Sequence, residues 1–133
     1  MNRSRPFVVY KEDCPVETRP DNANPHVRWW TLVSGDRSDS DSMTLGIAEI
    51  DPGDESAMRF HWHAPSETYF VLSGEGIVRI EDEDHEVSPG ATVFIPGGAW
   101  HATRNTGSEP LRLLYAFGVA SFKEVEYHYT RPA

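Results

Sequence analysis

Two short segments of the chain concentrate side chains that can bind a metal ion. The first is His61-Trp62-His63-Ala64-Pro65-Ser66-Glu67, and the second, farther along, is Pro96-Gly97-Gly98-Ala99-Trp100-His101. Imidazole nitrogens and carboxylate oxygens are good ligands for divalent transition metals. Side chains at positions i and i+2 of a strand point to the same face, so His61 and His63 should converge. Together the two segments predict one metal site.

The predicted ligands are His61, His63, Glu67 and His101. Around a tetrahedral Zn ion, four protein ligands would close the coordination shell and make the site structural. Around an octahedral ion, they would leave two adjacent positions for water, substrate or dioxygen. An open site of this kind can polarise a carbonyl group or, with Fe(II), bind dioxygen beside a substrate. We therefore expect one divalent ion as cofactor, with Fe, Mn, Zn and Ni as the candidates.

The spacing of the ligands extends into a longer pattern. It reads His-x-His-x3-Glu-x6-Gly from His61 to Gly74, then Gly-x5-Pro-x-Gly-x2-His-x3-Asn from Gly90 to Asn105. Over residues 53–105 the chain resembles the cupin superfamily. One departure is Glu55, which stands where the family pattern has a glycine six residues before the first histidine. The resemblance implies a double-stranded β-helix, the RmlC-like jelly-roll barrel, with the four predicted ligands inside it.

The distribution of turn residues and β-prone runs independently predicts an all-β domain. Short apolar runs alternate with turns rich in Gly, Pro, Asp and Asn, which is typical of a sandwich or barrel. We expect an arm and edge strands in residues 1–42, the barrel in 43–120 and a C-terminal tail in 121–133. Short strands are expected at 7–10 and 29–33. The barrel strands are expected at 43–50, 57–63, 67–73, 76–81, 85–87, 92–95, 100–105 and 111–119.

Strand parity predicts two further site residues. Counting by twos from the histidine pair turns Arg59 inward, and counting from Glu67 turns Tyr69 inward. Arg59 could anchor a substrate carboxylate or phosphate. Tyr69 could transfer a proton or hold a ligand. The alternatives are that Arg59 pairs with an acid at the barrel rim and that Tyr69 only packs in the core.

The same parity turns three large aromatic residues outward, namely Phe60, Trp62 and Trp100. Contiguous exposed apolar surface usually marks an interface. A homodimer interface would cover these residues, with the proline-rich arm lying over the partner. The alternative is that the chain's own tail covers them.

Composition limits the classes of partner. Twelve basic and twenty-one acidic residues give a net charge of −9, which disfavours binding to nucleic acid or to an anionic membrane surface. Cys14 is the single cysteine, so an intramolecular disulfide is impossible and a reducing compartment is favoured. With no apolar run of signal-peptide or membrane-span length, we expect a cytoplasmic protein.

The expected function is a metalloenzyme that acts on a small organic molecule. The reaction is open among dioxygenase, lyase or decarboxylase, and isomerase or cyclase chemistry, because a fold does not select a reaction. Oxygen-dependent cleavage is slightly favoured, since three histidines and a carboxylate with two free positions suit Fe(II). A non-enzymatic, metal-dependent binding module for a small molecule is the alternative.

Overall fold

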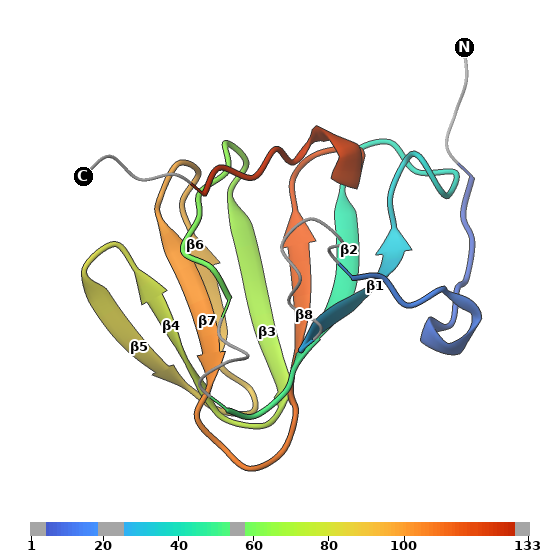
Figure 1. Cartoon of the computed structure of the whole chain (residues 1–133). Coiled ribbons are helices and arrows are strands. Elements are labelled where there is room, and N and C mark those ends of the chain that lie inside the picture. Colours follow the sequence, from blue (N-terminus) through green and yellow to red (C-terminus); the bar gives the residue numbers. More distant parts are fainter. Residues whose placement is uncertain (1–4, 19–25, 54–57, 130–133) are drawn as a thin grey trace.

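The computed structural model describes residues 5–18, 26–53 and 58–129 of the chain, and these form an almost entirely β structure (Figure 1). Two single-turn 3-10 helices, η1 (Lys11–Asp13) and η3 (Phe122–Glu124), are the helical elements of these residues. The strands are β1 (Val27–Val33), β2 (Thr44–Ile50), β3 (Glu67–Ser73), β4 (Gly76–Ile80), β5 (Glu83–Val87), β6 (Thr92–Ile95), β7 (His101–Asn105) and β8 (Leu111–Phe117).

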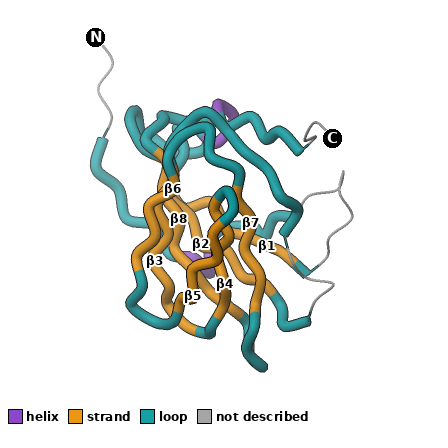
Figure 2. The backbone as a smooth tube through the Cα atoms, turned by 90° about the vertical axis from the view of Figure 1, so that its left-hand side faces the viewer, coloured by secondary structure: helices purple, strands orange, loops and turns teal. Residues whose placement is uncertain are grey.

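The strands form two antiparallel sheets that face each other. The larger sheet has the order β1-β2-β8-β3-β6 and the smaller one the order β5-β4-β7. Neighbours in the sheets are often distant in sequence, as in the pairing of β3 with β8 and of β4 with β7. Figure 2 shows the strands gathered in the body of the molecule, with most loops at its two ends. This is the expected jelly-roll barrel.

Alternating side chains place the core between the sheets. In β2 and β8 every second residue is buried, and β3 and β7 follow the same alternation over most of their length. Such a period of two is what a sheet with one covered face requires. The fully buried apolar side chains are Ile50, Val71, Val78, Ile95, Leu111, Leu113 and Phe117.

Most of the expected strands match the observed ones. The strands expected at 67–73 and 92–95 are found with those bounds, and the remaining barrel strands differ by one or two residues at their ends, apart from the segment before β3. The turn between the strands expected at 76–81 and 85–87 is shorter than those bounds imply, because β5 already begins at Glu83. No helix in the described part of the chain is long and apolar enough to cross a membrane.

Two expected strands are wrong. Residues 7–10 belong to no strand, and the described part of the arm pairs with the sheet at Glu17, opposite Trp29 of β1. Residues 58–63 make only isolated pairs, since Met58 and His61 bond to β7 while Trp62 bonds to the C-terminal segment. This segment pairs partly with β7 and partly with His128, so it forms no continuous ladder with either. Ala57, where this strand was expected to begin, lies outside the described residues.

Asn105, the last residue of the second motif, ties the end of β7 to two neighbouring segments. Its buried amide donates to the carbonyl oxygens of Ile50 and Glu109 and accepts from the backbone N–H of Gly107. Replacing Asn105 with alanine leaves all three groups without this partner. We expect a loss of about 2–3 kcal/mol in the free energy of unfolding. Urea denaturation measures it, with the exposed neighbour variant Thr106→Ala as a control expected to change stability by less than about 0.5 kcal/mol.

Candidate metal centre

Backbone pairing brings the two predicted motifs into contact. His101 is the first residue of β7 and exchanges two backbone hydrogen bonds with His61, of 2.8 and 3.0 Å. The turn before β7 is joined to the first motif by the N–H of Gly98, which donates to the carbonyl of His63 at 2.9 Å. Gly97 must be a glycine here, because a Cβ would overlap the carbonyl oxygen of Ala64. The Pro-Gly-Gly turn therefore allows the close approach of the two motifs.

Each histidine of the centre is oriented by a backbone carbonyl. Nδ1 of His61 donates to the carbonyl oxygen of Arg59 at 2.7 Å, Nδ1 of His63 to that of Pro65 at 2.9 Å and Nδ1 of His101 to that of Ala99 at 2.8 Å. A carbonyl oxygen can only accept, so Nδ1 carries the proton in all three rings. Nε2 is then left as the ligand atom, which is the arrangement typical of metal-binding histidines.

The ligand atoms of the three histidines converge in the barrel interior. His61, His63 and His101 are all buried, and one nitrogen of each lies within 4.8 Å of those of the other two. Nε2 of His101 has no hydrogen-bond partner among the described residues. The carboxylate of Glu67, the first residue of β3, lies 3.2 Å from Nε2 of His63 and 3.5 Å from Nε2 of His101.

This arrangement fits a bound cation. Nitrogen lone pairs and a carboxylate that face one another in a buried space repel unless a positive charge lies between them. A divalent ion would supply that charge and would also give the orphaned Nε2 of His101 a partner. The three histidines therefore can hold a metal ion, and Glu67 is positioned to be the fourth ligand. That each of these four residues binds the metal stays a prediction.

Burial and neighbouring charge shift the pKa values of the centre. Burial, followed by the repulsion of His101, lowers the pKa of His61 to about 3, so this ring is neutral near pH 7. Burial would also lower the pKa of His63, but the hydrogen bond and charge of Glu67 outweigh it and raise this pKa. Burial opposes ionisation of Glu67, yet His101 and His63 hold its pKa below the usual value. Glu67 is therefore a carboxylate, the form that binds metals.

A cavity of about 80 Å³ opens beside the centre, on the side of the larger sheet. His61 and Glu67 form one end of it, and Ala48, Leu113 and Met58 give it apolar walls. Aromatic rings supply much of the remaining lining, namely Trp29, Tyr69, Tyr115, Phe122, Tyr127 and Tyr129. Such a lining suits a small organic molecule that carries a positive charge, because the faces of aromatic rings attract cations.

Both sequence-predicted neighbours of the metal line this cavity, but in different ways. Tyr69 is buried on β3, and burial followed by the negative charge of Glu67 raises its pKa well above the usual value. Arg59 is exposed rather than turned inward, because its segment is not a regular strand and parity does not apply. Its guanidinium carbon lies 4.2 Å from the ring centroid of Tyr129. Arg59 thus stands at the solvent side of the cavity.

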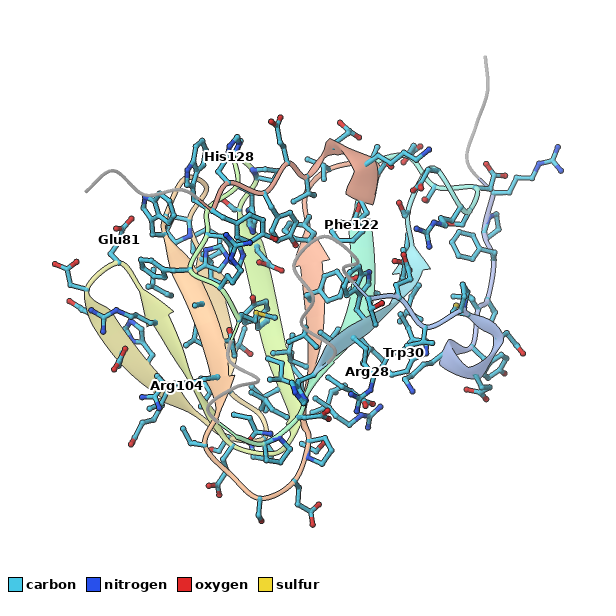
Figure 3. All side chains as sticks on the ribbon, viewed as in Figure 1. Arg28, Trp30, Glu81, Arg104, Phe122 and His128 are labelled. Atoms are coloured by element: carbon cyan, nitrogen blue, oxygen red, sulfur yellow. The ribbon has the colours of Figure 1, made fainter. Side chains whose placement is uncertain are left out.

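Residues 121–129, here called the C-terminal segment, supply site residues that the sequence did not indicate. The ring centroid of Tyr127 lies 5.0 Å from that of His61 and 5.2 Å from that of His63. Figure 1 shows the segment running across one end of the barrel, and Figure 3 shows Phe122 and His128 at that end. Alternating aromatic and charged residues were visible in the sequence, but nothing local connected them to the metal.

The C-terminal segment also covers one of the three aromatic residues expected at a dimer interface. His128 exchanges two backbone hydrogen bonds with Trp62, and their rings stack with centroids 4.1 Å apart. Phe60 and Trp100 stack on each other at 5.6 Å. All three aromatic residues are partly buried. For Trp62 the structure therefore favours the alternative reading, in which the chain's own tail is the cover.

Comparison with known proteins identifies the family. A model of the cupin domain family matches residues 46–117, which is more than half of the chain and contains both motifs. The chain belongs to the cupin family. This cupin is 41% identical over 128 residues to the dimethylsulfoniopropionate lyase DddW of Ruegeria pomeroyi, covering 96% of this chain and 82% of that protein.

Solved structures agree on the fold of this cupin. The polyketide cyclase RemF from Streptomyces resistomycificus superposes with a TM-score of 0.80 at 19% identity, over 97% of this chain and 88% of that one. A predicted oxalate decarboxylase from Thermotoga maritima gives a TM-score of 0.73 at 23% identity, over 85% and 99% of the two chains. At these identities the likeness concerns the fold alone. The 41% identity to a lyase supports enzyme activity.

Proposed function

We propose that this cupin is a metal-dependent lyase for a small sulfonium carboxylate of the dimethylsulfoniopropionate class. The observation that carries the proposal is the aromatic-lined cavity beside the histidine centre, in a chain 41% identical to a lyase of that name. A sulfonium group is a cation that cannot donate a hydrogen bond. Aromatic faces are the surfaces that bind such cations in proteins.

One side of the cavity is positively charged and the other is aromatic, and we use this difference to orient the substrate. Arg59 stands at the solvent side and would repel a sulfonium group, whereas its guanidinium can pair with a carboxylate. The ring centroid of Phe122 lies 6.0 Å from that of Trp29 and 6.2 Å from that of Tyr115. These three rings form an aromatic group on the β1 side of the cavity. We assign the sulfonium group to these rings and the carboxylate to Arg59 and the histidine end.

The proposed reaction is a β-elimination. Tyr69, as the phenolate, accepts a proton from the carbon next to the carboxylate at its phenolic oxygen. The electron pair left on carbon forms the C=C bond, and the C–S bond breaks with its electrons leaving on sulfur. The products are an α,β-unsaturated carboxylate, a neutral sulfide and a protonated Tyr69, so atoms and charge balance.

The residues of the chain prepare this step. A divalent ion held by His61, His63, Glu67 and His101 would supply Lewis-acid polarisation of the substrate when bound. Burial and Glu67 raise the pKa of Tyr69, while the positive charges of the ion and of the sulfonium group act in the opposite direction. The apolar walls exclude water from the carbon that loses its proton. We therefore expect Tyr69 to lose its proton when both the metal ion and the substrate are bound.

A direct assay tests the proposal. The protein is loaded separately with Fe(II), Mn(II), Zn(II) and Ni(II) and incubated with dimethylsulfoniopropionate, with and without dioxygen. We expect dimethyl sulfide and acrylate in equal amounts, at the same rate in both atmospheres. Strict dependence on dioxygen would instead support the oxygenase expected from the sequence. Saturable binding without product under every condition would support a binding module and contradict the lyase.

Arg59 gives a prediction that concerns binding rather than chemistry. Replacing Arg59 with alanine removes the proposed partner of the substrate carboxylate at the cavity mouth. We expect KM to rise about 10-fold, equivalent to about 1.4 kcal/mol of binding, with kcat changed by less than about 3-fold. Steady-state kinetics measure both constants. The matched control is Arg79→Ala, an exposed arginine of β4 outside the cavity, for which both constants should stay at the wild-type values.

A further inference from the structure

A polar cluster in the loop between β1 and β2 holds the start of the C-terminal segment. The carboxylate of Asp36 accepts hydrogen bonds from the hydroxyl groups of Ser34 and Ser121, the second at 3.0 Å. Ser34 is fully buried, and its oxygen accepts from the backbone N–H of Phe122 at 2.9 Å. We call Ser34, Asp36 and Ser121 the latch. The latch connects the β1–β2 loop to a part of the chain that lies 85 residues farther along the sequence.

The charge of Asp36 strengthens the latch. The hydrogen bond from Ser34 outweighs the effect of burial and holds the pKa of Asp36 below its usual value, so this side chain is a carboxylate near pH 7. Arg37 donates to its second carboxylate oxygen at 3.4 Å. Hydrogen bonds to an ionised acceptor are roughly twice as strong as bonds between neutral groups. Asp36 is therefore the residue on which the latch depends.

Backbone contacts bring the same two parts of the chain together. The N–H of Gly35 donates to the carbonyl oxygen of Ala120 at 2.6 Å, and a Cβ on Gly35 would lie 2.8 Å from that oxygen. The hydroxyl of Thr44, the first residue of β2, donates to the carbonyl oxygen of Val119 at 2.9 Å. Figure 1 shows the β1–β2 loop and η3 side by side at the same end of the barrel. The approach to the C-terminal segment is thus fixed from this loop.

The latch bonds directly to a residue of the cavity wall. Phe122 lines the cavity beside the metal centre. Its ring stacks on that of Phe117 with centroids 6.1 Å apart, in addition to its contacts with Trp29 and Tyr115. The cavity has a volume of only about 80 Å³, so the position of one ring in its wall limits what can enter.

Beyond the latch, the C-terminal segment has few backbone bonds to the barrel. It contains the single-turn helix η3 and belongs to no ladder. Among the described residues, its strand-like pairing is the isolated bridge between His128 and Trp62. A segment without a ladder takes its position from side-chain contacts and from the few hydrogen bonds that it makes. The latch is the set of hydrogen bonds closest to Phe122.

We propose that the latch holds Phe122 at a fixed place in the cavity wall, and that Phe122 thereby limits the cationic group of the substrate to about the size of dimethylsulfonium. Phe122 is then a specificity-determining residue, and Asp36 is a positioning residue that acts through it. A single methylene changes selection by a hydrophobic pocket by about 10–200-fold, so a fixed ring is sufficient for such a limit. The inference rests on the proposed function, because it concerns the cation of that substrate.

Binding of two cations of different size tests this limit without turnover. The probes are the carboxyethyl derivatives of trimethylammonium and triethylammonium, which keep the cation and the carboxylate but carry a poorer leaving group than a sulfide. Isothermal titration calorimetry with the Zn(II)-loaded full chain should give at least about 10-fold tighter binding of the trimethyl probe to the wild type. Phe122→Ala opens the wall and should reduce this preference to less than about 3-fold. Phe122→Leu should give an intermediate preference, and it replaces Phe122→Ala if that variant does not fold.

Asp36→Asn tests the latch separately from the wall. Asparagine keeps the size of the side chain but removes its charge and one of its two acceptor oxygens, so Phe122 should be held less firmly. We expect the preference for the trimethyl probe to fall by at least about 3-fold, with metal content unchanged. A variant that was merely less stable would bind both probes less well and keep their ratio. Asp41→Asn makes the same change at an exposed carboxylate of the same loop, outside the latch, and should keep the wild-type preference.

Three results would overturn the inference. They are equal affinity of the wild type for the two probes, an unchanged preference in the folded Phe122 variants, and a preference in Asp36→Asn equal to that in Asp41→Asn. Turnover of dimethylsulfoniopropionate is measured separately. A wild type that forms dimethyl sulfide but binds both probes equally contradicts this inference alone. A wild type that prefers the trimethyl probe but forms no product contradicts the lyase alone.

Discussion

His101→Ala is expected to abolish activity and to weaken metal binding by more than about 100-fold. Loss of a group that only orients a ligand already costs about 10–100-fold in metal affinity, so loss of a ligand should cost more. Nε2 of His101 is buried and has no partner among the described residues, and Glu67 faces it at 3.5 Å. The centre would then retain at most three protein ligands and an open side.

Metal content separates this effect from a loss of folding. Elemental analysis should give about one equivalent of metal for the wild type and little for His101→Ala. Added metal should raise the melting temperature of the wild type, because a ligand that binds only the folded state stabilises it. The variant should show no such rise at the same concentration. His85→Ala, an exposed histidine of β5, is the control and should behave as the wild type. A full equivalent of tightly bound metal in His101→Ala would remove this residue from the ligand set.

The parts of the centre that the residues alone predict are the local ones. A spacing of two residues places His61 and His63 together, and the Pro-Gly-Gly turn predicts the sharp reversal before His101. The pairing that unites the motifs, between His61 and His101, is a long-range contact. This pairing was expected only from the resemblance to the cupin superfamily, since the spacing of residues does not specify which strands are neighbours.

Parity succeeded where the strand is regular and failed where it is not. Tyr69 lies two residues after Glu67 in β3, whose burial alternates, and it is buried as expected. Arg59 lies in a segment with only isolated pairs, so its side chain is exposed at the cavity mouth instead. The position of the segment depends on Trp62 pairing with His128, at the far end of the chain. No local pattern encodes that contact.

The cavity lining was the least predictable part for the same reason. Phe122 and Tyr127 belong to a segment without a regular ladder, and their burial is set by what they contact rather than by their own periodicity. Ring contacts with Trp29 and His63 place them against the cavity. A C-terminal tail was expected in residues 121–133, and its described part, residues 121–129, lies across one end of the barrel.

Tyr69→Phe is expected to reduce kcat for the elimination by about 10²–10⁴-fold, which is the range for removing a general acid or base. The change deletes only the phenolic oxygen, so the ring still fills its place between Val93 of β6 and Tyr115 of β8. Metal content and melting temperature should therefore stay close to the wild-type values. KM should change little, because the proposed binding groups are the aromatic rings and Arg59.

Tyr115→Phe is the matched control for the missing oxygen. Tyr115 is also a buried tyrosine of the cavity, but its hydroxyl points toward Gly46, where a Cβ would overlap it, and has no hydrogen-bond partner among the described residues. Loss of this hydroxyl should lower kcat by less than about 10-fold. Exchange of the substrate's α-hydrogens in D₂O reports proton removal separately from C–S cleavage. If Tyr69→Phe keeps most of the wild-type kcat, or if both variants lose it equally, Tyr69 is not the base and proton removal must be assigned to another group in the cavity.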